Sequence, residues 1–226
     1  MKNIILQHYT GELGELEKLS QANMIKYAEF CGAEYELVQG DVFTEGLKTC
    51  GQKMYMLDSK WDEYDIVVMI DIDMFTRKGM TTNIFTEVQG IGMYTDFQRN
   101  LHRKLWSQFP TLIDTRFGYW GGAIYRLTKE QRKMLRSHIN MEELITNFND
   151  VFQDEGMMAR LATLARIPNN AEVLPGGFAW CHCSYRKGIE NSEMIHIRPT
   201  TEHGTKGKKI ENYYNLVNKG LICSGI

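Results

Sequence analysis

The pattern of apolar and polar positions is most distinctive at residues 66–75. Five consecutive apolar residues, Ile66 to Ile70, run into two aspartates, Asp71 and Asp73, that are one residue apart. A short apolar run rich in β-branched residues is typical of a strand buried on both faces, as in the middle of a parallel sheet. Burying an unpaired carboxylate is costly, so we expect the aspartates where this strand leaves the sheet. Open α/β sheets bind their ligands at that carboxyl edge.

The residues before this strand alternate between strand-like and helix-like patterns. The range 3–7 is a short apolar strand, and the helix that follows it should end at Cys31-Gly32, where glycine supplies a left-handed cap. A second strand is expected at Glu34 to Val38 and a second helix at Lys53 to Lys60. The strand–helix–strand order predicts a parallel sheet with right-handed crossovers, the pattern of a nucleotide-binding half-domain.

Beyond residue 78 the pattern loosens. Gly90 to Tyr94 is one expected strand, and Tyr119 to Arg126 is another that is entered through Gly121 and Gly122. These two glycines allow the backbone to approach a ligand closely, or they form a bulge, and the sequence leaves both readings open.

The second half also carries helix signals. Thr128 and Gln131 have the spacing of a capping box, and residues 141–148 form a further expected helix. Asp154 and Glu155 open the next one, where the helix dipole alone favours acidic residues and catalysis is the alternative. Two more elements are expected near the end of the chain: a strand starting at Val173-Leu174 and a helix from Asn212 to Lys219.

Three short segments near the C-terminus carry candidate chemistry. A lone histidine, His196, interrupts the apolar segment 194–199, and its simpler interpretation is a core residue. The glycine- and lysine-rich range 203–209 suits an oxyanion such as phosphate, although a solvated loop is the commoner meaning. Cys181-His182-Cys183 lacks a second pair at zinc spacing, so buried thiols are favoured there.

Composition limits the class of protein. The 226 residues suffice for one sizeable core, and the formal net charge of −2 gives no sign of a nucleic-acid-binding surface. No apolar run approaches the roughly 20 residues that span a bilayer, and the N-terminal apolar run is too short for a signal peptide. The five cysteines show no disulfide framework. We therefore expect a soluble cytoplasmic protein with reduced thiols.

The paired aspartates predict a metal site. Two carboxylates one residue apart repel each other unless a cation lies between them, and hard oxygen ligands suit Mg²⁺ or Mn²⁺. Such an ion usually takes its remaining ligands from a substrate phosphate. The alternative is a pair of solvated aspartates at a turn.

In this order, the residues resemble those of metal-dependent glycosyltransferases of the GT-A fold, which use a nucleotide-sugar donor. The likeness is greatest to the galactosyl- and xylosyltransferases of plants and fungi and to small viral glycosyltransferases, and it covers residues 1 to about 200. The features that carry it are the run 23–32, Lys53, the turn 62–65, Asp71-Ile72-Asp73, Gly121-Gly122-Ala123, Asp154-Glu155 and His196. The family usually has a glycine soon after the late histidine, whereas Arg198-Pro199 follows here, so His203 with Gly204 is the rival metal ligand.

The resemblance implies a single α/β domain, 1–226, of the GT-A (Rossmann-like) fold. Its central sheet is mixed, mainly parallel and flanked by helices, with a nucleotide-binding half at 1–78 and a donor-sugar and acceptor half at 79–226. The implied activity moves a sugar from a nucleoside-diphosphate sugar, with UDP-sugars favoured, to a hydroxyl of a glycan or glycoprotein. Mn²⁺ or Mg²⁺ assists departure of the diphosphate.

The resemblance also implies roles for individual residues. Asp71, Asp73 and His196 would hold the metal, and imidazole favours Mn²⁺ over Mg²⁺. For the rest of the donor, the resemblance implies His8, Tyr9 and Thr10 at the nucleobase and Lys53 at the ribose or a phosphate, with Asp71 and Ile72 also in contact with the donor. Gly121 and Gly122 would lie at the donor sugar. Lys206 or Lys208 would bind the diphosphate. Asp154 or Glu155 would contact sugar hydroxyls or serve as the general base.

Two other classes of function remain open. One is a metal-dependent nucleotidyltransferase or phosphohydrolase, which shares aspartates at a strand end but would need further carboxylates or a phosphate loop. The other is an inactive module that binds a nucleotide-sugar. The donor base, the donor sugar, the acceptor, the stereochemistry and the oligomeric state stay undetermined, while the chain's small size and lack of an anchor favour a viral or bacterial enzyme.

Overall fold

A computed structural model describes residues 1–87, 105–114, 121–148, 153–167, 173–174, 178–200 and 207–224. Its central sheet has four strands in the order β2 (Glu34–Gln39), β1 (Asn3–Tyr9), β3 (Ile66–Asp71) and β5 (Ile124–Thr128). The first three strands are parallel, and β5 runs antiparallel to β3. The sheet is therefore mixed and mainly parallel, as expected.

The pairing of the strands brings their ligand-side ends together. His8 on β1 lies opposite Asp71 on β3, so the carboxyl ends of both strands reach the same edge. Because β5 is antiparallel, its beginning reaches that edge too, and the Asp71 N–H donates to the Ala123 carbonyl at 2.9 Å. Residues from three separate parts of the chain thus meet at one edge of the sheet.

A second, smaller sheet continues from this edge. It has the order β4 (Met74–Thr76), β9 (Met194–His196) and β8 (Cys181–Cys183). β4 is antiparallel to β9, with Met74 opposite His196, and β8 is parallel to β9. Since β4 follows β3 after a short turn, this pairing carries His196 to the two aspartates. A separate two-stranded ribbon joins β6 (Val173–Leu174) to β7 (Phe178–Ala179).

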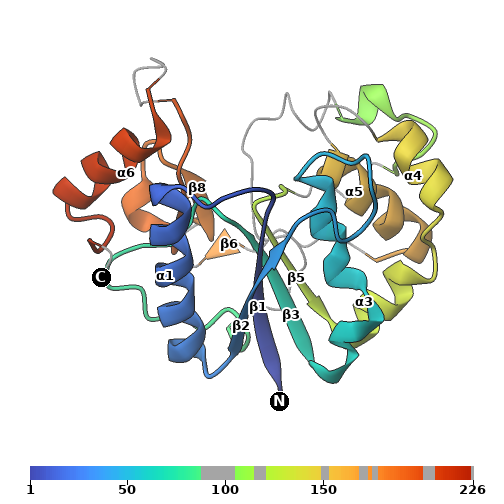
Figure 1. Cartoon of the computed structure of the whole chain (residues 1–226), viewed down its shortest axis with the longest axis horizontal. Coiled ribbons are helices and arrows are strands. Elements are labelled where there is room, and N and C mark those ends of the chain that lie inside the picture. Colours follow the sequence, from blue (N-terminus) through green and yellow to red (C-terminus); the bar gives the residue numbers. More distant parts are fainter. Residues whose placement is uncertain are drawn as a thin grey trace.

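Helices cover both faces of the central sheet (Figure 1). α1 (Glu15–Cys31) and α6 (Lys209–Asn218) lie on one side, and α3 (Lys129–Arg136), α4 (Met141–Asn147) and α5 (Gln153–Ala165) lie on the other. The described residues also contain short 3₁₀ segments, among them η1 (Gly51–Leu57), η2 (Ser59–Glu63) and η4 (Ile189–Asn191). No helix of the described ranges is long and apolar enough to cross a membrane.

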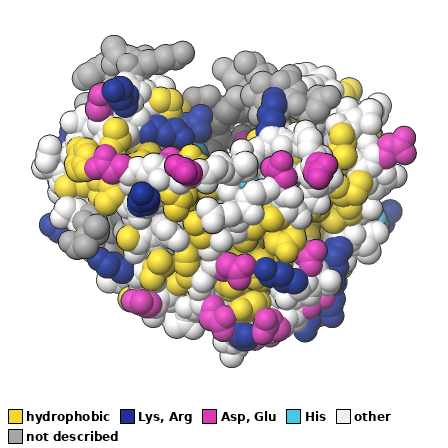
Figure 2. Space-filling model, viewed as in Figure 1, with side chains coloured by type: hydrophobic (Ala, Val, Ile, Leu, Met, Phe, Trp, Pro, Cys, Tyr) yellow, Lys and Arg dark blue, Asp and Glu magenta, His cyan; other side chains and the backbone are white. Residues whose placement is uncertain are grey.

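The core is split by the sheet, as alternation along a buried strand requires. Ile4 and Leu6 of β1 belong to the cluster under η1, α3 and α5, whereas Ile5 between them packs against α1. A third cluster joins Phe75 and Ile195 of the small sheet to Tyr213 of α6. On the surface, acidic and basic side chains are interspersed over the face seen in Figure 2.

Two helix boundaries lie where the sequence predicted a helix cap. α1 ends at Gly32, whose φ of 66° is the left-handed cap that glycine adopts readily. α3 begins with the expected capping box: the Gln131 N–H donates to Thr128 Oγ1 at 3.2 Å, and the Thr128 N–H donates to Gln131 Oε1 at 2.9 Å.

Other boundaries differ from the prediction. Residues 53–60 are not one α-helix, because the chain extends at Asp58 (ψ 147°) and the Asp58 carboxylate accepts the Lys60 N–H at 2.8 Å, which starts a new 3₁₀ turn. The strand expected over Tyr119 to Arg126 is described from Ile124, after a turn at 122–123, while residues 119 and 120 lie outside the described residues. α6 starts at Lys209, earlier than expected, and Glu211 accepts the Lys208 N–H there. The strand expected at 90–94 lies outside the described residues.

Candidate functional site

Asp71, Asp73 and His196 form a compact group of two carboxylates and one imidazole. Asp71 ends β3, Asp73 lies in the turn before β4, and His196 ends β9. One ligand atom from each lies within 4.8 Å of the others. His196 Nε2 is 3.0 Å from Asp73 Oδ1 and 3.8 Å from Asp71 Oδ2. Within the described ranges this is the one such group found, and its N/O donor set suits Mn²⁺.

Charge pairing dominates the electrostatics of this group. Burial alone would lower the pKa of His196, but the adjacent Asp73 carboxylate raises that pKa to about 10. Burial would also raise the pKa of Asp73, yet His196 and Lys209 together hold it well below its usual range. Asp73 is therefore an ionised carboxylate between two cations. A divalent ion at this position would take over the role of those cations.

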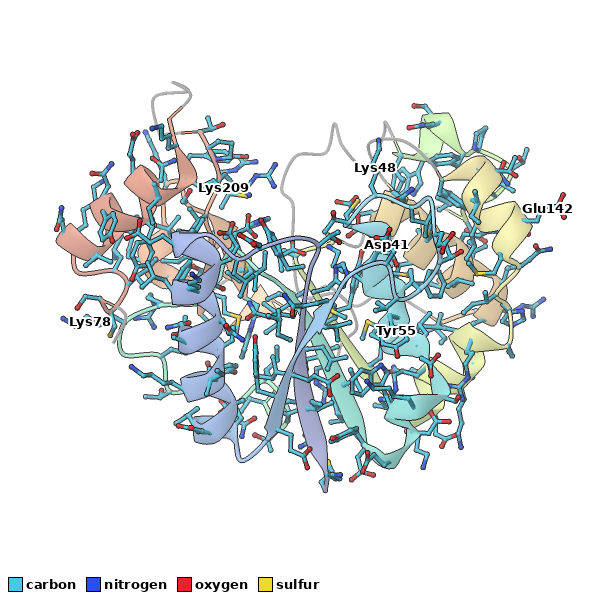
Figure 3. All side chains as sticks on the ribbon, in the orientation of Figure 1. Asp41, Lys48, Tyr55, Lys78, Glu142 and Lys209 are labelled. Atoms are coloured by element: carbon cyan, nitrogen blue, oxygen red, sulfur yellow. The ribbon has the colours of Figure 1, made fainter. Side chains whose placement is uncertain are left out.

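Lys209 is a site residue that the sequence analysis missed. It is the first residue of α6, and its ammonium donates to Asp73 Oδ2. In Figure 3 its side chain lies on the side of α6 that faces the middle of the molecule. The alternatives considered from the sequence were Lys206, which lies outside the described residues, and Lys208, which precedes α6. The rival ligand His203 also lies outside them.

The orientation of His196 is held by its neighbours on the small sheet. Cys183 lies opposite His196 in the β8–β9 ladder and its side chain is hydrogen-bonded to the imidazole. The Ser184 N–H donates to the His196 carbonyl at 2.8 Å. Cys183 is thus a neighbour of the predicted metal ligand, and the thiols of Cys181 and Cys183 are buried, as expected.

Lys53 lies directly beside this group. Its ammonium is 2.7 Å from Asp71 Oδ1, 2.5 Å from Asp154 Oδ2 and 2.6 Å from the Gly122 carbonyl oxygen. Only 5 % of Lys53 is exposed, which excludes the interpretation of a solvated helical lysine. Burial opposes the charge, but Asp154 and Asp71 outweigh that effect and raise the pKa of Lys53. The ammonium is therefore a permanent cation under the end of β3.

Gly122 is a glycine because Asp154 lies against it. A Cβ atom at Gly122 would overlap Asp154 Oδ2 and would lie 3.2 Å from Lys53 Nζ. The resemblance placed Gly122 at the donor sugar; in the structure the space that a side chain at this position would fill is taken by the Asp154 carboxylate. Gly121 is buried next to it, and Glu155 is half-buried one residue along α5.

His8, Tyr9 and Thr10 lie at the same edge of the sheet, at the end of β1. His8 is buried, and its Nε2–H donates to the Gly40 carbonyl at 2.7 Å, which leaves Nδ1 as an acceptor without a partner. Burial lowers the pKa of His8, so the ring is neutral at neutral pH. Tyr9 is half-buried and Thr10 is exposed.

A buried polar network under the aspartates also escaped sequence analysis. Gln7 is fully buried, and its amide donates to Ser20 Oγ at 3.0 Å and to the Asp71 carbonyl at 3.1 Å. The Ser20 hydroxyl donates to the Met74 carbonyl at 2.7 Å, and the Tyr35 hydroxyl donates to Gln7 Oε1 at 2.9 Å. The network holds both ends of the turn that contains half-buried Ile72 and the candidate metal ligand Asp73.

Comparison with known proteins adds the identity of the fold. No family model and no curated protein sequence matches the chain. Among solved structures it is similar to a glycosyltransferase involved in the glycosylation of the major capsid of PBCV-1, with 11% identity, 96% of this chain and 98% of that chain covered, and a TM-score of 0.54. It is also similar to the galactosyltransferase LgtC in complex with donor and acceptor sugar analogs, with 10% identity, 99% and 97% coverage and a TM-score of 0.56.

Mouse xyloside xylosyltransferase 1 is a further structural relative, with 10% identity, 87% of this chain and 97% of that chain covered, and a TM-score of 0.50. These neighbours have the GT-A fold, and the chain has it too, as its sequence predicted. The match extends over nearly the whole of each chain, so it includes the edge of the sheet where the candidate site lies.

Proposed function

We propose that this protein transfers a sugar from a nucleoside-diphosphate sugar to a hydroxyl group of a glycan or glycoprotein. The observation that carries the proposal is the group of Asp71, Asp73 and His196 at the ligand-binding edge of a GT-A fold. Two chain segments that are far apart in the sequence, 71–73 and the end of β9, converge to build it, and its donor atoms suit a divalent ion that also binds phosphate. Neither the fold alone nor the acidic pair alone would support so specific a reaction.

The metal is proposed to be Mn²⁺, with Mg²⁺ as the alternative, because one of the three ligands is an imidazole. When bound, the ion supplies Lewis-acid stabilisation of the departing diphosphate. The protein's own part is to hold Asp71, Asp73 and His196 in position. Lys209 is then free to donate to a phosphate oxygen, since the ion replaces it as the counter-charge of Asp73.

The donor base is proposed to bind at the end of β1, with UDP-sugars favoured. His8 Nδ1 is a buried acceptor, because Nε2–H is committed to Gly40. A ring N–H such as that of uracil or guanine complements this atom, whereas cytosine and adenine present another acceptor at that position. Tyr9 would stack on the base and exposed Thr10 would line its edge. The His8 acceptor fits uracil and guanine alike, so the preference for UDP-sugars follows the family resemblance, and the sugar is left open.

Three further assignments are proposals of the same kind. Gly121 would leave room for the donor sugar, and Glu155 would contact its hydroxyls or act as the general base. Lys206, outside the described residues, would join Lys209 at the diphosphate.

The test is the thermal stability of the purified protein with a panel of nucleotide-sugars, each with and without Mn²⁺. A ligand present at 100 times its Kd stabilises the native state by about 2.7 kcal/mol. We expect UDP-sugars to raise the melting temperature only when Mn²⁺ is present, and Asp73→Asn to abolish the shift.

Sugar transfer to a model acceptor is then measured with the donor that binds. Absence of any shift across the panel would overturn the proposal. Rapid release of inorganic phosphate would indicate a phosphohydrolase instead, and Mn²⁺-dependent binding without turnover on any glycan acceptor would indicate an inactive binding module.

A further inference from the structure

The ammonium of Lys53 has no capacity left for a substrate. A lysine has three N–H donors, and here they face three acceptors of the protein: Asp71 Oδ1, Asp154 Oδ2 and the Gly122 carbonyl oxygen, all within 2.5–2.7 Å. The side chain is also buried. A contact with a ribose or phosphate of the donor would require one of these bonds to break.

Because Lys53 binds one oxygen of Asp71, the two oxygens of this carboxylate have different roles. Oδ1 accepts from the lysine, whereas Oδ2 is the oxygen on the side of His196, 3.8 Å from Nε2. The lysine therefore fixes the rotation of this carboxylate and presents a single oxygen to the metal position. Without the lysine, both oxygens would be available and the carboxylate would be free to rotate.

Asp154 is poorly placed to act as a general base. A base must bring its oxygen within hydrogen-bond reach of the acceptor hydroxyl. Asp154 is only 4 % exposed; its Oδ2 is 2.5 Å from the Lys53 ammonium and occupies the space left by the missing side chain of Gly122. It also lies in the first turn of α5, where the helix dipole favours acidic side chains without any catalytic role. What it does from there is hold Lys53.

We propose that Lys53 and Asp154 are positioning residues that orient Asp71 toward the metal, and that neither contacts the donor or the acceptor. The pair links η1 and α5 to the end of β3. Loss of an outer partner of a metal ligand typically lowers metal affinity by about 10–100-fold. This inference rests on the proposed function, because it assumes that Asp71 is a metal ligand.

The test uses Asp154→Asn, which keeps the shape of the side chain and removes its charge. We expect the Kd for Mn²⁺, measured on the protein without donor, to rise by about 10-fold or more. Excess Mn²⁺ should then restore most of kcat. If Asp154 were the base, the Kd for Mn²⁺ would be unchanged, and kcat at saturating Mn²⁺ would fall by about 10²–10⁴-fold with an altered pH profile. That result would overturn the inference.

A matched control is Glu142→Gln, which makes the same chemical change in the first turn of α4. Glu142 is exposed and points away from the molecule in Figure 3, so its removal should leave the Kd for Mn²⁺ unchanged. If this variant weakened Mn²⁺ binding as much as Asp154→Asn, the effect would be one of net charge and the positioning role would be refuted.

A second measurement tests the ion pair without any metal. Lys53→Met alone leaves Asp71 and Asp154 close together without a cation, so the double variant Lys53→Met/Asp154→Asn should unfold at a higher denaturant concentration than Lys53→Met. A double variant less stable than both single variants would contradict the pairing. If wild-type protein binds no Mn²⁺, the proposed function itself fails, whereas unchanged Mn²⁺ affinity in Asp154→Asn refutes only the inference.

Discussion

His196 is the residue whose protonation would change on binding of the proposed metal ion. Its pKa of about 10 in the metal-free protein lies above the ordinary value of 6.5, because Asp73 stabilises the imidazolium. The stability that this pairing adds is fully present below pH 6.5 and is lost as the pH rises through about 10. A metal ion needs the neutral ring, so it competes with a proton throughout that range.

The affinity for Mn²⁺ should therefore rise with pH, by up to about tenfold per unit, between pH 6 and 8.5. Direct Mn²⁺ titration at several pH values measures the slope. In His196→Ala the affinity should be low and its dependence on pH much weaker. A flat profile for the wild-type protein would mean that His196 is neutral before the metal arrives.

Gly122→Ala tests how tightly Asp154 is packed. The added methyl group would overlap the Asp154 carboxylate, so we expect a loss of about 1–3 kcal/mol in the free energy of unfolding. Chemical denaturation measures it, with Gly207→Ala as the control, because a Cβ atom there meets its nearest neighbour, Glu211, at an ordinary 3.6 Å. Equal midpoints for the two variants would show that the space beside Gly122 is not constrained.

At the residue scale, the sequence indicated which residues could bind a metal, but it did not indicate which side chains contact them. Asp71 and Asp73 were found because a buried strand leads into them. The partners of Lys53 could not be read from the sequence, because Asp71, Gly122 and Asp154 are distant from it along the chain and are brought to it only by the fold. Lys209 is one of several lysines near α6, and only the first turn of that helix determines which of them reaches Asp73.

At the scale of elements, Arg132 of α3 joins three segments through its guanidinium. It is fully buried and donates to the carbonyls of Leu127 (3.1 Å), Trp61 (2.9 Å) and Tyr64 (2.7 Å). Burial lowers its pKa to about 10, so the group is still charged at neutral pH. These bonds hold η2 against the start of α3.

Arg132→Met should lower the free energy of unfolding by about 2 kcal/mol or more, because three carbonyls lose a charged donor and a buried acceptor left without a donor costs about 1–3 kcal/mol. The Trp61 carbonyl still accepts the Tyr64 N–H at 3.0 Å. Lys133→Met is the control, since Lys133 is exposed on the same helix and its 3.9 Å pair with Glu130 is worth little. Denaturant midpoints measure both. A loss below about 1 kcal/mol for Arg132→Met would contradict the structural role.

Some elements are determined by the preferences of neighbouring residues, and others by pairing with strands that are distant in the sequence. Gly32 and Thr128 mark helix ends through local backbone and capping preferences, so the sequence predicted them. The small sheet depends on Met74 meeting His196 from the other end of the chain, and a three-residue strand carries too short a pattern to indicate that. The break at Asp58 was missed for a similar reason, because one side-chain cap decides it.

At the scale of the whole molecule, the proposed metal site joins the two sheets, because Asp71 belongs to the central sheet and His196 to the small one. Mn²⁺ at 100 times its Kd should therefore stabilise the whole protein, by about 2.7 kcal/mol, in a single transition. Thermal unfolding followed by calorimetry tests this, with Asp73→Asn as the control. Two transitions, of which Mn²⁺ shifts only one, would show that the two sheets unfold separately.

The direction of β5 has a practical consequence. Because this strand runs antiparallel to β3, the residues just before it, 121–123, lie at the ligand edge, whereas its last residue, Thr128, pairs with Ile66 at the opposite edge, near the start of β1. Loop exchange intended to alter ligand choice belongs before β5. A surface anchor or fusion partner belongs at the N-terminus, where it would leave the edge with the candidate site pointing away from the support (Figure 1).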